Sequence, residues 1–254
     1  MASVTTLKTP KREMDEWQLR VDLAAAFRLA AQNGWHEAIA NHFSLAVSAD
    51  GKKFLMNPKW RHFSRIKASE LLLLDATDKE TMDRPDAPDA SAWCIHGHLH
   101  AGAPQARCIL HCHPPYATAI AALADPEVKP IEQNTARYYN RIAIDLGFTG
   151  IADNDAEGER LVKALGNRSR MMMGNHGILV VADTVAEAFD DLYYLERACQ
   201  TLVLAYSTGQ KLNVMSPELA ERTAQGWIDY KDSAFSHFEE MKAILDEKDP
   251  SYAD

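Results

Sequence analysis

Residues 106–115 read ARCILHCHPP, and this stretch decides the fold that the sequence predicts. The part up to His111 favours a β-strand, and the doubled proline Pro114-Pro115 must end that strand. His111 and His113 stand two positions apart at the strand end, where alternate residues share a face. Both imidazoles can therefore converge on one metal ion, while Cys112 between them would point the other way.

A glycine-bounded histidine further along the chain extends this pattern. Gly174, Asn175 and Gly177 flank His176 in a tight turn between two apolar segments. Neither a helix nor a strand pattern accounts for an imidazole there, so a functional position is at least as well supported as a plain turn residue. A His-x-His pair alone is more often an ordinary surface or core pair. Three neutral imidazoles with an open coordination position, however, describe a catalytic metal site.

The segment before the strand carries further histidines. His96 and His100 share one face of a predicted helix, and His98 points elsewhere, so a second metal pair is one reading. Because no carboxylate accompanies them as in a His-Glu-x-x-His motif, we interpret His96 and His100 as pocket-wall or polar core residues.

Hydrophobic periodicity predicts that helices and strands alternate along the chain. An Asp-Gly turn signal at 50–51 joins two short strands, and Thr184 with Glu187 forms a capping box that begins a long helix. The predicted helices are 16–32, a short one near Ala68 before the buried run 71–74, 91–101, 116–123, 156–165 and 184–202. The predicted strands are 39–47, 53–56, 106–111, 142–146, 171–173 and 178–181. This alternation, without a composition break or an internal repeat, predicts an α/β fold.

The domain organisation follows from length and composition. The chain of 254 residues, 46% of them hydrophobic and 25% charged, is long enough to bury a full core. We predict an N-terminal arm at 1–15, a single domain at 16–245 and a frayed acidic tail at 246–254. The four cysteines form no CxxC motif or regular framework, which favours reduced packing thiols over disulfides.

Charge and hydropathy limit the partners. Twenty-seven Lys and Arg against 36 Asp and Glu leave a formal net charge of -9, whose field repels nucleic acid and anionic membrane surfaces. No apolar run approaches the roughly 18 to 20 residues that cross a bilayer. Residues 14–16, Met-Asp-Glu, stand where a signal peptide would need an apolar core. We therefore expect a cytoplasmic protein with a small-molecule partner, no nucleic acid and no membrane.

The order and spacing of several motifs resemble those of the class II aldolase and adducin family over roughly residues 16–210. These motifs are Ile39 to Ser44, Asn57-Pro58, Ala106 to His113, Gly174 to Gly177, Thr184 to Phe189 and, further along the same predicted helix, Leu195 to Ala198. The resemblance implies a three-layer α/β/α domain with a largely antiparallel central sheet. It also implies a catalytic metal held by His111, His113 and His176, and a cyclic homotetramer with active sites at subunit interfaces. Zinc is the expected ion, and manganese, iron and cobalt are alternatives.

One departure from the family concerns the acid/base group. Aldolases of the family carry a glutamate where this sequence has Ala92. Glu132 stands near the position where family dehydratases place a catalytic glutamate, although a solvated loop carboxylate is an equal reading of it. Tyr139 is the predicted proton donor, and Arg137 is predicted to clamp an anionic group of the substrate.

Substrate-binding residues are expected in two places before the histidines. Asn41 and Ser91 match family positions that contact phosphate, and Lys59 and Arg61 add positive charge to a neighbouring loop. These residues predict an anionic substrate. The bulky Trp60 stands where phosphate-binding aldolases have a small loop, so a carboxylate is at least as plausible as a phosphate.

The leading functional hypothesis is a metal-dependent carbon–carbon lyase that performs retro-aldol cleavage or decarboxylation. Its substrate would be a small anionic carbonyl or hydroxy-carbonyl compound. An iron(II)-dependent oxygenase on the same scaffold is one alternative, because three histidines can form an open face for oxygen. A non-catalytic, adducin-like assembly module is the other, and it is motivated by Ala92 and by the apolar stripe from Val185 to Leu202.

Overall fold

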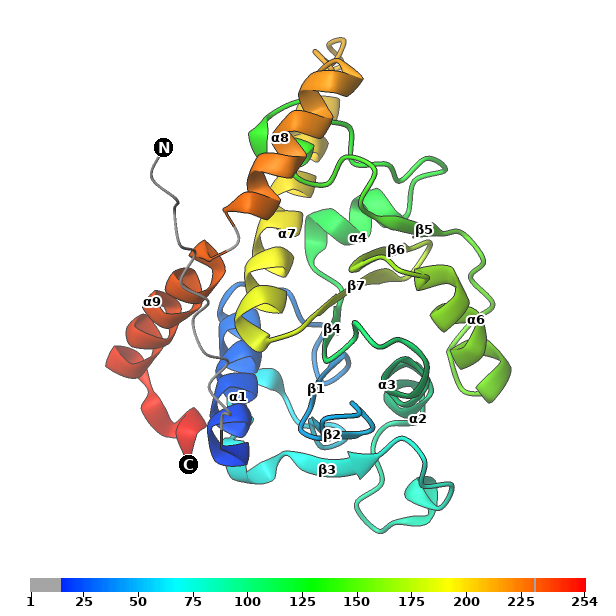
Figure 1. The fold of residues 1–254 in the computed structure, drawn as a ribbon, viewed down its shortest axis with the longest axis vertical. Coiled ribbons are helices and arrows are strands. Elements are labelled where there is room, and N and C mark those ends of the chain that lie inside the picture. Colours follow the sequence, from blue (N-terminus) through cyan, green and yellow to red (C-terminus); the bar gives the residue numbers. More distant parts are fainter. Residues whose placement is uncertain (1–14, 231) are drawn as a thin grey trace, which may run out of the picture.

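The computed structural model describes residues 15–230 and 232–254, and Figure 1 shows how its elements are arranged. The predicted N-terminal arm at 1–15 therefore lies almost wholly outside the described residues. Within the described ranges, every helix is too short or too polar to cross a membrane.

The centre of the fold is a sheet of seven strands in the order β3-β2-β1-β4-β7-β6-β5. Neighbouring strands are antiparallel, except that β5 pairs with β6 in parallel. The strands are β1 (His42–Ala46), β2 (Lys53–Met56), β3 (Leu72–Asp75), β4 (Cys108–Cys112), β5 (Ala143–Asp145), β6 (Arg170–Met173) and β7 (Gly177–Ala182). The stretch that we took as decisive thus forms β4, the middle strand.

Helices cover both faces of this sheet, which confirms the three-layer α/β/α fold with a largely antiparallel sheet (Figure 1). One face packs against α1 (Glu16–Gln32), α4 (Pro115–Ala121) and α7 (Val185–Ser207), and α9 (Ser233–Lys248) packs against α1 and α7. The other face packs against α3 (His98–Gly102) and α6 (Asp155–Leu165). The remaining helices are α2 (Ala90–Ala92), a π-helical turn (Trp93–Gly97), α5 (Gln133–Ala136), α8 (Pro217–Asp229) and 3-10 turns at Phe63–Arg65, Ala68–Glu70, Thr81–Asp83 and Pro250–Ala253.

Strict alternation along β4 assigns its side chains to the two layers. Cys108, Leu110 and Cys112 are buried in the larger core with α1 and α7, whereas Ile109 belongs to the core beneath α3 and α6. His111 lies on the same face of the strand as Ile109. Cys112 therefore points away from the two histidines, as alternation predicts. All four cysteines are free thiols, in agreement with the expectation of packing residues.

The structure corrects the prediction for residues 68–74. Only one 3-10 turn forms at Ala68–Glu70, and β3 follows it at the edge of the sheet. Leu73 on this edge strand is 41% exposed, so the leucine run is not a continuous buried segment. The error arises because a short apolar run does not by itself distinguish a buried element from an edge strand.

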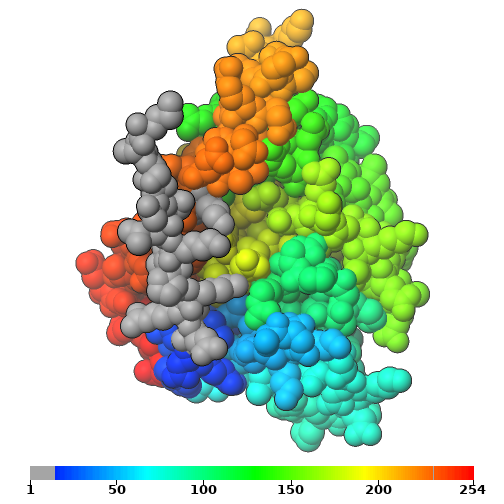
Figure 2. Space-filling view, viewed as in Figure 1, coloured from blue at the N-terminus to red at the C-terminus, as the bar shows by residue number. Residues whose placement is uncertain are grey.

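The C-terminal region also differs from the prediction. The prediction did not include α8 or α9, and α8 stands out from the body with the end of α7 (Figures 1 and 2). The expected frayed tail at 246–254 is wrong, because α9 continues to Lys248 and Tyr252 is only 3% exposed. The Tyr252 hydroxyl donates to Asp246 over 2.7 Å.

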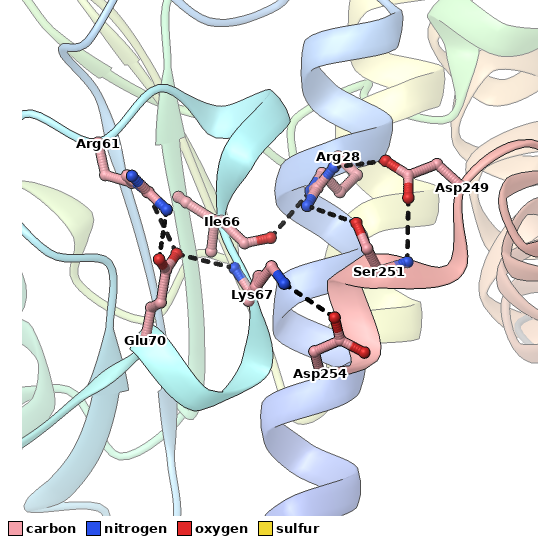
Figure 3. A network of polar contacts seen from close by, with 8 residues as sticks. All are labelled: Arg28, Arg61, Ile66, Lys67, Glu70, Asp249, Ser251 and Asp254. Carbon is pink, nitrogen blue, oxygen red and sulfur yellow. Dashed lines mark hydrogen bonds and ion pairs between the residues drawn. The ribbon is translucent and has the colours of Figure 1, made fainter.

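Ion pairs and a hydrogen bond connect this tail, α1 and residues 66–67, which lie between two 3-10 turns (Figure 3). The buried Arg28 guanidinium donates to the Ile66 carbonyl over 2.8 Å and pairs with Asp249 over 3.0 Å. Lys67 pairs with Asp254 over 2.8 Å. Because buried arginine is expensive unless it is paired, these long-range contacts hold the C-terminus in place.

Candidate metal centre

Three imidazoles from two elements converge at one end of the central strands. His111 and His113 come from the end of β4, and His176 comes from the turn between β6 and β7. Their potential ligand atoms all lie within 4.8 Å of one another. The ring centroids of His176 lie 4.7 Å from those of His111 and 4.8 Å from those of His113. The structure therefore brings together the three predicted ligands.

The turn that carries His176 depends on its glycines. A Cβ added to Gly177 would clash with Cδ2 of His113 and would lie 2.8 Å from the carbonyl oxygen of Cys112. A Cβ at Gly174 would lie 2.9 Å from the carbonyl oxygen of Asp145. No side chain fits at such distances, so Gly177 lets the turn approach the end of β4 and Gly174 lets it approach the end of β5, which places His176 beside the other two rings.

Hydrogen bonds on the far side of two rings fix which nitrogen is free. Nδ1 of His111 lies 2.9 Å from the carbonyl oxygen of Ile178, which can only accept, so Nδ1 carries the proton and Nε2 is bare. Nδ1 of His113 contacts the Glu37 carboxylate in the same way. A carboxylate or carbonyl behind a ligand imidazole is the usual outer contact in metal sites.

An orphaned atom supports a metal ion at this position. Among the described residues, Nε2 of His113 is buried and has no hydrogen-bond partner. Buried polar atoms normally have a partner, and each exception needs a physical explanation. An ion bound by the three imidazoles would supply the missing partner, so these side chains fit a divalent transition metal.

His111 and His176 are also in the protonation state that metal binding requires. Burial, and then the neighbouring His113, lower the pKa of His176 to about 4. Burial also holds the pKa of His111 well below its usual range. Both rings are therefore neutral near pH 7, and a neutral imidazole is the form that coordinates a metal.

Replacement of Glu37 by glutamine tests the outer contact of His113. The carboxylate is replaced by a neutral amide, which holds the imidazole less firmly and lowers its basicity. We expect metal affinity to fall by about 10- to 100-fold, measured by competition with a chelator. Glu240→Gln on the exposed side of α9 is the matched control and should leave affinity unchanged. Equal affinities in both variants would mean that Glu37 does not orient the ligand.

A small pocket lies beside the centre and contains three of the predicted substrate-binding residues. Its volume is about 210 Å³, and its lining includes Asn41, His42, Lys59, Ser91 and Ala92. The His42 ring also stacks on His111 with 4.9 Å between centroids, which connects the pocket to the candidate metal centre. Sequence reasoning missed His42, although its register opposite His111 across two strands follows from strand pairing.

The other predicted site residues lie elsewhere within one chain. Arg61 pairs with Glu70 and does not line this pocket. Glu132 caps α5, and its carboxylate accepts from the backbone N–H groups of Asn134 and Thr135 over 2.8 and 2.6 Å.

Arg137 is held in a contact between helices. It pairs with Asp190 over 2.8 Å and lies over the ring of Tyr194. Tyr139 is half-buried just after α5. Neither residue belongs to the histidine cluster or to the pocket, so the predicted role of Arg137 as a clamp and of Tyr139 as a proton donor stays a prediction.

His96 and His100 are buried polar residues, as we interpreted them. His96 is 0% and His100 is 4% exposed. His100 stacks on Phe54 and lies 2.7 Å from the Ser44 hydroxyl. Burial, and then the charge of Arg107, lower the pKa of His100 to about 3.

This burial predicts sensitivity to acid. In the unfolded chain His100 takes up a proton below pH 6.5, whereas the folded protein keeps it neutral down to about pH 3. The unfolded state then binds more protons at His100, so this residue alone should lower the free energy of unfolding by up to about 1.4 kcal/mol for each pH unit between 6.5 and about 3. In His100→Phe this proton uptake is lost, while the neighbouring His96 and Arg107 remain. The dependence of the free energy of unfolding on pH should therefore be weaker in the variant, measured by urea unfolding at pH 7, 5 and 4. An unchanged slope would contradict the assignment.

The fold and the three converging imidazoles define an α/β protein with a candidate metal centre beside a polar pocket. Comparison with known proteins identifies its family. The family model for the class II aldolase and adducin N-terminal domain matches residues 21–203. The chain therefore belongs to the class II aldolase and adducin family.

Individual relatives agree with this assignment. A protein of Caulobacter vibrioides, described provisionally as an aldolase class 2 protein, is 32% identical over 94% of this chain and 93% of its own length. Human beta-adducin is 27% identical over 88% of this chain but only 31% of the adducin. The crystal structure of an aldolase II superfamily protein from Pseudomonas syringae has a TM-score of 0.83 and 30% identity, and 97% of each chain is covered.

Proposed function

We propose that this protein is a metal-dependent carbon–carbon lyase that acts on a small anionic carbonyl or hydroxy-carbonyl compound. The single observation that carries the proposal is the convergence of three imidazoles, one of which has a buried Nε2 without a hydrogen-bond partner among the described residues. Three histidines leave a coordination position open for a reactant, which is typical of catalytic sites and not of closed structural ones.

His111, His113 and His176 would hold a divalent ion, which would supply a Lewis acid for a substrate carbonyl and for the negative charge that develops beside it. The chain's own residues bind and orient the substrate. Lys59 offers a positive charge to an anionic group, and Asn41 and Ser91 offer hydrogen bonds in the same pocket. This arrangement suits retro-aldol cleavage and decarboxylation, because both reactions leave charge beside a carbonyl.

The acid/base group is the open step of the mechanism. Ala92 lines the pocket, so no side-chain carboxylate is available at that position. We propose that Glu132 and Tyr139 reach the centre from a neighbouring subunit of a homotetramer, since within one chain they lie outside the site. Two exposed apolar residues support a subunit contact there: Phe148, whose ring centroid lies 6.1 Å from that of His176, and Leu146, which lies beside Gly174.

The proposal is tested by metal analysis and by assays of bond cleavage. Purified protein should contain about one divalent transition metal, with zinc expected, per chain. Incubation with a panel of hydroxy-ketone phosphates and hydroxy-keto acids should release an aldehyde or carbon dioxide, and a chelator should stop the release. Failure of the metal-loaded protein to cleave any member of the panel would contradict the lyase proposal.

The same experiment tests two alternative functions. Substrate-dependent oxygen uptake by the iron(II)-loaded protein, without anaerobic cleavage, would favour an oxygenase. The non-catalytic reading is supported by Ala92 and by the relationship to adducin. It predicts an assembly that is unchanged after metal removal and shows no turnover.

A further inference from the structure

Six polar side chains form one continuous chain of hydrogen bonds from the pocket into the interior. In order, they are Asp89, Ser91, His42, His96, Ser44 and His100. The Ser91 hydroxyl lies 2.7 Å from Asp89 Oδ1 and 3.5 Å from Nε2 of His42. Nδ1 of His42 lies 2.9 Å from Nε2 of His96. The Ser44 hydroxyl lies 2.6 Å from Nδ1 of His96 and 2.7 Å from Nε2 of His100.

The carboxylate end of the chain fixes the direction of the protons. An ionised carboxylate only accepts, so the Ser91 hydroxyl donates its one proton to Asp89. The Ser91 oxygen can then only accept from His42, which places a proton on Nε2 of His42. A neutral imidazole carries one proton, so Nδ1 of His42 is bare and accepts from Nε2–H of His96.

The interior end independently favours the same direction. Continuing along the chain, Nδ1 of His96 accepts from the Ser44 hydroxyl, whose oxygen accepts from Nε2–H of His100. This leaves a bare lone pair on Nδ1 of His100, which is buried and has no partner among the described residues. The opposite direction would put a proton there, and a buried N–H without an acceptor is rarer than an unpaired acceptor.

We propose that this chain holds His42 as its Nε2–H tautomer and that the N–H donates to an anionic oxygen, of a phosphate or a carboxylate, bound in the pocket. His42 lines that pocket with Lys59. The contact to Ser91, at 3.5 Å, is long for a hydrogen bond, so the N–H retains most of its capacity for a ligand. The other tautomer would turn a lone pair toward the anion. This inference rests on the proposed anionic substrate and identifies the group that recognises it.

Nuclear magnetic resonance of the full chain labelled with [15N]histidine tests the tautomer. Long-range 1H–15N correlations distinguish a protonated from a bare ring nitrogen, and His42→Gln identifies the His42 signals. We expect Nε2–H and a bare Nδ1 for both His42 and His96. Ser44→Ala interrupts the series of hydrogen bonds and leaves the lining of the pocket unchanged. It should shift His42 toward a mixture of tautomers. A proton on Nδ1 of His42 in the unaltered protein would overturn the inference.

Titration with inorganic phosphate and with glycolate tests the donor role. The more tightly bound probe identifies the anionic group that the pocket accepts, and its addition should shift the His42 Nε2 signal. His42→Phe keeps a flat ring against His111 but removes the donor, so probe affinity should fall about tenfold or more. His42→Gln keeps an amide N–H near the same position and should retain most of the affinity. Equal affinity of the Phe variant and the unaltered protein would refute the donor role.

Metal analysis of the same samples separates this inference from the proposed function. A protein without metal or turnover whose His42 N–H still responds to phosphate would contradict the lyase and support the anion site. If the metal-loaded protein is an active lyase but its His42 signal does not change with phosphate or glycolate, the anion site is contradicted and the lyase proposal stands.

Discussion

Replacing His176 with alanine is expected to remove the bound metal and to reduce lyase turnover by about three orders of magnitude. Two imidazoles from β4 would remain, and they cannot hold a tetrahedral ion with one open position. Without the ion, the negative charge that develops beside the substrate carbonyl in the transition state would lose several kcal/mol of stabilisation. A loss of this size corresponds to the expected change in rate. Metal content by mass spectrometry and turnover of the identified substrate measure the two effects.

His176 is the best of the three ligands for this test because it lies in a turn. His111 is 1% exposed in the central strand, so its loss would also damage the core. His98→Ala is the matched control, since this histidine lies outside the cluster and its Nδ1 lies 2.8 Å from the Cys94 carbonyl of its own helical segment. Full metal content and full turnover in the His176 variant would exclude the three-histidine centre.

The parts of the fold that sequence predicted correctly are those with local causes. The doubled proline and the alternation of 106–115 suffice to define β4, and Thr184 caps α7 by accepting from the Glu187 N–H over 3.2 Å, as the capping box predicts. The turn Gly174 to Gly177 can also be predicted from its glycines, because only glycine tolerates the close backbone approach found there. The three candidate metal ligands come from these two local signals.

The parts that sequence did not predict depend on contacts between distant residues. The C-terminal tail carries no apolar periodicity, and it is ordered because Asp249 pairs with Arg28 far back in α1. His42 enters the site through strand register, which pairs it with His111. Glu132 illustrates the opposite problem. A carboxylate at a suitable sequence distance from the histidines turns out to cap a short helix of its own chain.

Glu196 on α7 gives the second large expected effect. Its two carboxylate oxygens accept from the backbone N–H groups of Tyr116 and Ala117 over 3.0 and 2.7 Å, in the first turn of α4. The first N–H groups of a helix have no partner within the helix, and Glu196 is only 5% exposed. Glu196→Ala leaves two donors unsatisfied in the interior, so we expect the free energy of unfolding to fall by about 3 kcal/mol in urea titrations.

A glutamine at the same position separates hydrogen bonding from packing. Glu196→Gln keeps the shape and one acceptor oxygen, so we expect a loss of only about 1 kcal/mol. Because α4 begins at Pro115, two residues after His113, the alanine variant should also weaken metal binding, whereas the glutamine variant should weaken it less. Equal stability of the two variants would mean that the carboxylate fills space without capping α4. Loss of stability with unchanged metal affinity would show that the position of His113 does not depend on α4.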